Sequence, residues 1–258
     1  MTPKTSAPYL LINNNNSRTK FALANRDELL EHRVTDTRTL TAKTLLNELQ
    51  GWQFEKIILA SVVPEKARLI RDALSQQYPL LDINHQIQLG ITVDFPNPAS
   101  IGADRLANAA AVVALHHSTP AVVVDFGTAV TFDIISADRA YIGGVIAPGL
   151  DVMTDYMHQR TALLPKIDLA EPPAAIGKST VDAMLSGAVH GYRGLVQEIL
   201  VQVEKELPSG KSPMIVATGG YAELIAAGLP QIQTVESYLT LEGLRIIGNL
   251  NFKHPHVQ

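Results

Sequence analysis

The sequence predicts an α/β protein built from two similar halves, and three observations support this prediction. Apolar residues make up 46% of the 258 positions and charged residues 18%, so the chain can fill packed cores and lacks the composition of a disordered protein. Strand-like and helix-like patterns alternate along the chain, as they do in layered α/β folds. A strand, a polar turn and a returning strand occur near residue 9 and again near residue 121, which indicates duplicated domains rather than a repeat of about 20–50 residues.

The first half is expected to span residues 9–118, after a tail at residues 1–8 that we expect to be disordered. Residues 9–12 are apolar and form the first predicted strand. The polar run at 13–17 predicts a tight turn, and a second strand follows at 19–24. Further patterns predict a helix at 40–49, a buried strand at 56–61, a helix at 65–77 and an Ala-rich helix at 104–115.

The second half is expected to span residues 119–258, and it repeats the opening of the first. A strand at 121–124 runs into a polar turn at 125–128, and another strand follows. Val122 lies 112 positions after Leu10, and the same offset places Thr131 opposite Thr19. The remaining patterns predict helices at 150–160, 181–207 and 239–250, and a strand at 214–217 that ends in Thr218-Gly219-Gly220.

Composition and charge exclude several classes of protein. The net charge of -4 and the pI of about 6.1 argue against a nucleic-acid partner, which usually requires a basic surface. The chain has no cysteine, and therefore no disulfide, thiolate nucleophile or Cys-ligated zinc. No stretch of 18 apolar residues predicts a membrane span. Residues 1–8 lack the apolar segment of a signal peptide, so we expect a cytoplasmic protein.

The turn Asp125-Phe126-Gly127-Thr128 follows three consecutive valines, at the end of a buried strand. A carboxylate at this position can hold a cation, and glycine lets the backbone approach a ligand closely. The Thr128 hydroxyl can bond a phosphoryl oxygen. This composition suits a phosphate and metal site. The alternative is a plain hairpin turn in which Asp125 bonds its own backbone.

The segment Gly102-Ala103-Asp104-Arg105 stands where a Pro-rich loop meets the Ala-rich helix. The helix dipole and the first-turn N–H groups stabilise an anion at this position. Asp104 is therefore a candidate catalytic carboxylate, or simply a first-turn acid beside a solvated Arg105. Gly219-Gly220 has two explanations. The glycines either let the backbone approach a nucleotide or meet only the steric requirements of a strand-to-helix turn. The chain has no P-loop pattern, so a kinase of this sequence is not of the P-loop type.

Taken in order, these segments resemble those of the type III pantothenate kinases, a branch of the superfamily that includes sugar and acetate kinases, heat-shock ATPases and actin. The resemblance extends from about Tyr9 to Asn251. Its most specific parts are Asn97-Pro98-x-x-Ile101-Gly102-Ala103-Asp104-Arg105, Asp125-x-Gly127-Thr128-Ala129-x-Thr131 and Gly143-Gly144-x-Ile146-x-Pro148-Gly149. The resemblance implies duplicated ribonuclease H-like (actin-like ATPase) domains, each with a mixed sheet and flanking helices.

The resemblance also implies roles for individual residues. Asp104 would be the catalytic base that takes the proton of the primary hydroxyl of pantothenate. Asp125 would be the metal ligand, holding a monovalent cation, K⁺ or NH₄⁺. The ATP-binding residues would be Asn13, Asn14, Asn15, Asn16, Ser17, Arg18, Thr19, Lys20 and Thr128. The substrate-binding residues would be Phe95, Gly102, Ala103, Asp104, Arg105 and Thr180.

The function that the resemblance implies is the phosphorylation of pantothenate to 4'-phosphopantothenate, the first step of coenzyme A biosynthesis. The cofactors would be ATP, Mg²⁺ and the monovalent cation. The resemblance further implies a homodimer, with pantothenate bound close to the partner subunit. Neither nucleic acid nor a membrane is an expected partner.

The first motif departs from the family pattern Asp-x-Gly-Asn-Thr/Ser, because this sequence has Asn13 and Asn15 at the positions of the Asp and the Gly. An amide keeps an acceptor oxygen but has no charge, so Mg²⁺ should be held less tightly. Asn15 is expected to tolerate the positive φ of a glycine position. Two hypotheses follow: an active kinase whose Mg²⁺ is held mainly by ATP and water, or a weak or inactive relative with a nucleotide-binding or regulatory role.

Overall fold

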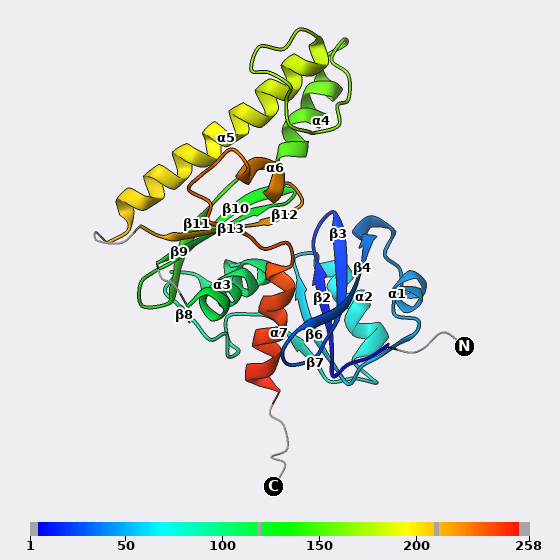
Figure 1. Cartoon of the computed structure of the whole chain (residues 1–258). Helices are drawn as coiled ribbons and strands as arrows, with labels where there is room; N and C mark the ends of the chain where they lie inside the picture. Colours follow the sequence, from blue (N-terminus) through cyan, green and yellow to red (C-terminus); the bar gives the residue numbers. More distant parts are fainter. Residues whose placement is uncertain (1–4, 118–119, 209–211, 253–258) are drawn as a thin grey trace. The chain divides into compact units, whose positions relative to one another are not determined.

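In a computed structural model the chain forms two compact units, and the structure describes residues 5–117, 120–208 and 212–252 (Figure 1). Unit 1 comprises residues 1–117 and 238–258, and unit 2 comprises residues 118–237. The chain leaves unit 1 one residue before the predicted boundary at 118/119. The prediction that residues 119–258 form a single half is wrong at its end, because the last helix belongs to unit 1.

The elements of unit 1 are mostly strands in its first third. They are β1 (Thr5–Ser6), β2 (Tyr9–Asn14), β3 (Arg18–Ala24), β4 (Leu29–Asp36), η1 (Thr37–Thr39), α1 (Ala42–Glu48), β5 (Trp52–Gln53), β6 (Lys56–Ser61), α2 (Pro64–Leu74), β7 (Leu80–Asp82), β8 (Thr92–Val93), η2 (Pro98–Ser100), α3 (Ala103–His116) and α7 (Leu239–Asn251). The elements of unit 2 are β9 (Ala121–Phe126), β10 (Ala129–Ile135), β11 (Ala140–Pro148), α4 (Leu150–Arg160), α5 (Thr180–Glu206), β12 (Met214–Gly219), α6 (Ala222–Ala226) and β13 (Thr234–Val235).

Five strands of each main sheet follow the same order, β4-β3-β2-β6-β7 in unit 1 and β11-β10-β9-β12-β13 in unit 2. In each, three consecutive strands are antiparallel, and two later strands add in parallel beside the first of them. This identity of topology confirms the predicted duplication and the α/β fold with mixed sheets.

The two hairpins differ by one residue in the turn. Asn14 pairs with Thr19 nearest the first turn, whereas Phe126 pairs with Val130 nearest the second. Thr131 consequently pairs with Asp125. The turn of unit 1 therefore has one residue more than its counterpart, in the segment that carries the polar run.

The sheet of unit 1 is covered by helices on both faces. Leu10 and Ile12 belong to a core cluster that also contains apolar residues of α1 and α2. Their neighbours in the strand point to the opposite face, because side chains alternate along a strand. There Gly248 of α7 lies so close to Ile58 that a Cβ would be 2.9 Å from its Cγ1. Each fully buried Leu or Ile stabilises the fold by roughly 1.5–3 kcal/mol, so unit 1 depends on α7 for one of its two apolar faces (Figure 1).

The start of the described chain is ordered into a strand, which differs from the predicted tail at residues 1–8. Thr5 and Ser6 pair in parallel with Trp52 and Gln53, and Ala7 N donates to Gln53 O over 2.9 Å. The first four residues of that predicted tail lie outside the described residues. Across the described ranges no helix combines the length and the apolar character that crossing a membrane requires.

Candidate active site

The first hairpin ends β2 with two buried asparagines on opposite faces of the sheet. Asn13 follows Tyr9 and Leu11 by the alternation of the strand and therefore points to the face covered by α3 and α7. Its side chain is 1% exposed, and Oδ1 has no hydrogen-bond partner within the described residues. An unsatisfied buried acceptor costs about 1–3 kcal/mol, so Asn13 is a candidate for binding a ligand.

The backbone of Asn15 differs from the prediction. Among the described non-glycine residues, positive φ occurs at His117 and Arg139 and not at Asn15. A left-handed conformation is thus not the reason that asparagine is accommodated there. The Oδ1 atom of Asn15 is a second buried acceptor without a hydrogen-bond partner in the described part of the chain.

Asp104 is the second residue of α3, after the N-cap Gly102. Arg105 N donates to its Oδ1 over 2.9 Å, so one carboxylate oxygen is bonded to the first turn of its own helix. The positive end of the helix dipole favours the ionised carboxylate. The side chain is half-buried, which suits both roles that the sequence left open, a first-turn acid and a reacting base.

Unit 1 brings this carboxylate and the first hairpin to the same end of its sheet. Val62 N donates to Asn14 O over 3.1 Å. On the other side of Val62, its Cγ1 would lie 3.5 Å from a Cβ placed on Gly102. The hairpin, the end of β6 and the start of α3 are therefore contiguous at the carboxyl ends of the parallel strands β2 and β6, where α/β sheets usually bind ligands.

Unit 2 brings together three turns at its corresponding sheet end. Gly149 N donates to Thr128 O over 3.1 Å, and a Cβ on Gly149 would lie 2.3 Å from that oxygen. Gly219 has φ 97°, and a Cβ there would lie 2.6 Å from Phe126 O and 2.7 Å from Asp125 Oδ1. Both glycines are required by these close approaches. Asp125 and Thr128 thus lie in a cradle of glycine-rich backbone.

Two tyrosines hold this cradle, and sequence reasoning missed both. The hydroxyl of Tyr192, on α5, donates to Pro148 O over 3.0 Å, and burial raises the pKa of that phenol far above its usual value. The hydroxyl of Tyr221 donates to Asp151 Oδ1 in the first turn of α4. Both bonds join residues 44 or more positions apart, so no local pattern could have indicated them.

The other residues that the sequence singled out occupy two separate places. Phe95 is half-buried in unit 1, just before η2. Thr180 is the first residue of α5 in unit 2 and is exposed. Ser179 caps this helix by accepting from Asp182 N over 3.1 Å, which fixes the backbone at the start of α5.

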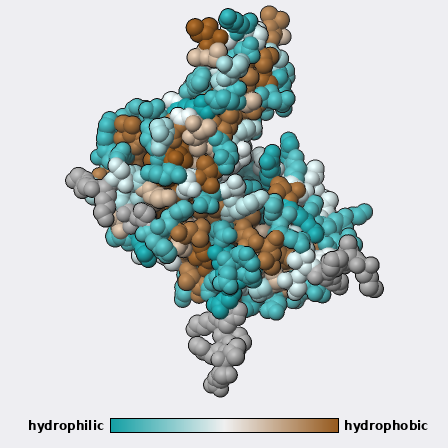
Figure 2. Space-filling model, viewed as in Figure 1, coloured by the Kyte–Doolittle hydropathy of each residue, from teal (hydrophilic) through white to brown (hydrophobic). Residues whose placement is uncertain are grey.

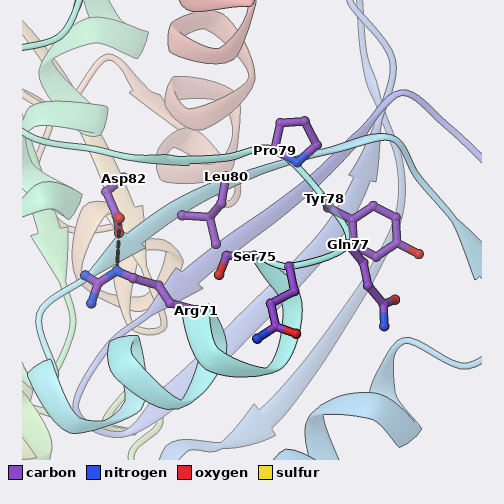
Figure 3. Close-up of a pocket in the computed structure, with 8 residues that line it drawn as sticks. Arg71, Ser75, Gln77, Tyr78, Pro79, Leu80 and Asp82 are labelled. Atoms are coloured by element: carbon purple, nitrogen blue, oxygen red, sulfur yellow. Dashed lines mark hydrogen bonds and ion pairs between the residues drawn. The ribbon is translucent and has the colours of Figure 1, made fainter.

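A hollow of about 530 Å³ lies elsewhere in unit 1, between the end of α2 and β7 (Figure 3). Arg71 is the cation of this hollow, and its Nε donates to both carboxylate oxygens of Asp82 over 3.1 and 2.9 Å. Each charge is thereby compensated by the other. The candidate active site is therefore the sheet end with Asn13 and Asp104, which carries buried acceptors and a carboxylate.

Comparison with known proteins identifies the family. The sequence profile of the type III pantothenate kinase family matches residues 9–202. A type III pantothenate kinase of Akkermansia muciniphila is 49% identical over 244 residues, covering 94% of this chain and 99% of that protein.

Two solved structures share the fold at low sequence identity. A protein of Campylobacter jejuni assigned to the Baf family of transcriptional activators has a TM-score of 0.58 at 20% identity, with coverage of 93% and 97%. A protein of Sinorhizobium meliloti assigned as a 2-dehydro-3-deoxygalactonokinase has a TM-score of 0.57 at 15% identity, with coverage of 93% and 98%. The fold is thus that of the actin-like ATPase superfamily, and the chain belongs to the type III pantothenate kinase family.

Proposed function

We propose that the chain transfers the γ-phosphoryl group of ATP to the primary hydroxyl of pantothenate, giving ADP and 4'-phosphopantothenate, the first step of coenzyme A biosynthesis. The names of its relatives support the reaction. The observation that carries it is the meeting of the first hairpin and Asp104 at one end of the unit 1 sheet, through Val62.

In the proposed reaction the carboxylate of Asp104 accepts the hydroxyl proton as the alcohol oxygen bonds to the γ-phosphorus and ADP leaves. A general base of this kind contributes roughly 10²–10⁴-fold to the rate. Phosphoryl transfer otherwise requires positioning and charge neutralisation. Residues 13–20 would hold the ATP phosphates with backbone N–H groups and Lys20. The match of motifs also assigns Thr128 to ATP.

Pantothenate carries a carboxylate and hydroxyl groups, which suit the residues around Asp104. Gly102, Ala103 and Arg105 would line its site, with the Arg105 guanidinium as a partner for the carboxylate. The match of motifs also assigns Phe95 and Thr180 to the substrate, the first as an apolar contact and the second as a hydroxyl. These assignments rest on the matching of motifs and on the placement of the first three residues beside the base.

Two cations complete the proposal, and the residues present fit both. Mg²⁺ prefers oxygen ligands and keeps several waters. The buried Oδ1 atoms of Asn13 and Asn15, which lack partners within the described residues, could accept hydrogen bonds from its waters or bind it directly. The Asp125 carboxylate, close to the Phe126 carbonyl, offers oxygen atoms of the kind that K⁺ or NH₄⁺ takes. When bound, Mg²⁺ would neutralise phosphate charge that Asn13 cannot.

We further propose a cytoplasmic homodimer. The end of unit 2 that carries α4 exposes large apolar side chains (Figure 2). Leu163 is 90% exposed, Ile176 81% and Tyr156 58%. Monomers rarely expose clusters of this kind, and a second copy would cover them. The cytoplasm is where ATP and the intermediates of coenzyme A synthesis are available.

The test is a coupled assay of ADP release with purified protein, ATP, Mg²⁺ and pantothenate, with and without K⁺, and mass detection of the phosphorylated product. Turnover that requires pantothenate is the expected result. ADP release with other hydroxy acids but not with pantothenate would overturn the substrate. The alternative of a regulatory relative is not favoured, because the relatives are named type III pantothenate kinases. Nucleotide binding without turnover in this assay would support that alternative.

A further inference from the structure

A set of buried polar side chains lies beneath the first hairpin, on the face opposite to Asn13. Asn14 and Thr19 are 0% exposed and Thr37 is 2% exposed. Unlike Asn13, these side chains bond other protein groups with their polar atoms, so they are engaged within the protein and not with a ligand. Ser61, half-buried at the end of β6, completes the set. Removing these polar side chains from water is costly unless they bond one another. They do, in a single chain of hydrogen bonds.

The bonds run from β6 to the hairpin turn. Ser61 Oγ donates to Asn14 Oδ1 over 2.6 Å, and Asn14 Nδ2 donates to Thr19 Oγ1 over 2.7 Å. Thr19 Oγ1 and Thr37 Oγ1 are 2.9 Å apart. Thr37 Oγ1 in turn donates to the backbone oxygen of Asn15 over 2.6 Å. The last acceptor lies in the turn to which ATP binding is assigned.

Counting protons fixes the direction of every bond. A hydroxyl has one proton, and Thr37 uses its own for the Asn15 oxygen. In the pair of threonines Thr19 must therefore be the donor. Ser61 accepts from Val63 N over 3.1 Å. Its proton goes to Asn14 Oδ1, at 2.6 Å, in preference to Val63 O, at 3.3 Å. This chain of hydrogen bonds forms a relay in which every donor points the same way. It runs from Val63 N through Ser61, Asn14, Thr19 and Thr37 to Asn15 O.

The end of the relay orients a peptide group. In a trans peptide the carbonyl and the following N–H point in opposite directions. Thr37 holds the Asn15 carbonyl towards the interior, and the N–H of the exposed Asn16 is directed away from it. Backbone N–H groups aimed outward from a turn are the donors that bind phosphate oxygens. The origin of the relay, at Ser61 and Val63, flanks the residue that contacts Gly102.

We propose that Ser61, Asn14, Thr19 and Thr37 are positioning residues, which set the geometry of the ATP-binding hairpin through this one-way relay. The proposal rests on the assignment of residues 13–20 to the ATP phosphates. It changes the role of Asn14 and Thr19, whose side chains act through the backbone of the turn and not by touching ATP. It also adds Thr37 and Ser61, which no motif indicated.

The primary test compares Thr37→Val, which keeps the shape and removes the donor, with Thr37→Ser, which keeps the hydroxyl. Thr39→Val is the matched control, because Thr39 Oγ1 also donates to a backbone oxygen, that of Asp36, over 3.0 Å in the same short helix but outside the relay. We expect Thr37→Val to raise the KM for ATP and the dissociation constant of an unreactive ATP analogue by roughly three- to tenfold. The KM for pantothenate should stay constant, and Thr37→Ser should restore the wild-type values.

Two further variants keep the outcome decisive. Ser61→Ala breaks the other end of the relay, and because the relay acts as one unit, Ser61→Ala with Thr37→Val should raise the KM for ATP little more than either alone. Ser17→Asp places an anion in the exposed turn and tests the hairpin itself. If Ser17→Asp weakens ATP binding while Thr37→Val and Ser61→Ala do not, or if Thr39→Val has an equal effect, the relay has no positioning role. If none of these variants changes ATP binding, the assignment of the hairpin to ATP fails.

Discussion

Gly102 leaves the space that the carboxylate of Asp104 occupies: a Cβ on Gly102 would lie 2.6 Å from Asp104 Oδ1. The same Cβ would be 3.5 Å from Val62, an ordinary contact. The backbone of Gly102, with φ -59°, is open to any residue. The glycine is therefore required by the position of one carboxylate, and not by the fold of the chain around it.

Gly102→Ala should lower kcat by tenfold or more, because a displacement of a reacting group by about 1 Å can cost roughly 100-fold. Loss of the glycine N-cap should lower stability by only about 1 kcal/mol. Steady-state kinetics and thermal unfolding check the two effects separately. An unchanged kcat would show that the position of Asp104 is not critical.

Asp104→Asn should reduce kcat by roughly 10²–10⁴-fold, the contribution of a general base. The amide oxygen can still accept from Arg105 N, as Asp104 Oδ1 does over 2.9 Å, so the start of α3 and the melting temperature should change little. Equilibrium binding of ATP provides the control and should be preserved. A variant that turns over at the wild-type rate removes Asp104 from the mechanism.

Asn13→Asp should lower the Mg²⁺ concentration that gives half-maximal rate. A carboxylate buried at this 1% exposed position needs a compensating positive charge, and a bound divalent cation would supply that charge. Without Mg²⁺ the variant should unfold at a lower temperature than the wild type, and Mg²⁺ with ADP should reverse this. Identical Mg²⁺ dependence in both proteins would place position 13 away from the metal.

Gly219 and Gly220 form a matched pair. Gly219→Ala combines a φ of 97° with contacts of 2.6 Å to Phe126, so it should destabilise unit 2 by about 1–3 kcal/mol or more. Nothing lies within 4 Å of a Cβ on Gly220, and Gly220→Ala should leave the melting temperature nearly unchanged. Thermal unfolding without nucleotide compares them. Equal destabilisation by both would contradict the arrangement of the cradle around Asp125 and Thr128.

The ion pair of Glu171 with Arg193 should make stability depend on pH. Arg193 donates to both carboxylate oxygens over 2.8 and 2.7 Å, and this hydrogen bonding lowers the pKa of Glu171 from its ordinary 4.5. A lowered pKa gives a stabilisation that is present above the unfolded value and lost as pH falls through the folded value.

Glu171→Gln is the variant that removes this charge, while Arg193 keeps its bonds to the carbonyls of Leu224 and Ile225. We expect a lower melting temperature than wild type at neutral pH, and a difference that shrinks towards zero below about pH 4. A difference that persists in acid would assign the effect to packing.

The duplication was predictable from sequence because each hairpin is local: an apolar strand, polar residues and a returning strand specify it within about 16 residues. The candidate site was predictable for Asp104 and Asp125, since each follows a recognisable junction of elements. The one-residue difference between the turns was not, because it depends on pairing register and not on spacing.

The remaining differences arise from contacts that are distant along the chain. The polar run predicts a turn at Asn14, yet Asn14 is the last residue of β2 and is buried beside its partners Thr19 and Ser61. Sequence order predicts that the helix at 239–250 belongs to the second half. Gly243 of this helix instead packs against the backbone of Ala107, and a Cβ on Gly243 would lie 2.0 Å from the Ala107 carbonyl oxygen. Polarity and sequence order describe the local chain, whereas these contacts depend on the completed fold.

The return of α7 to unit 1 makes unit 2 an insertion within unit 1, and this fixes an order of events on the ribosome. Residues 118–237 leave the exit tunnel before α7 does. Unit 2 can therefore fold during synthesis, while one apolar face of the unit 1 sheet remains uncovered. During that interval the nascent chain should expose this apolar surface, until α7 emerges and covers it.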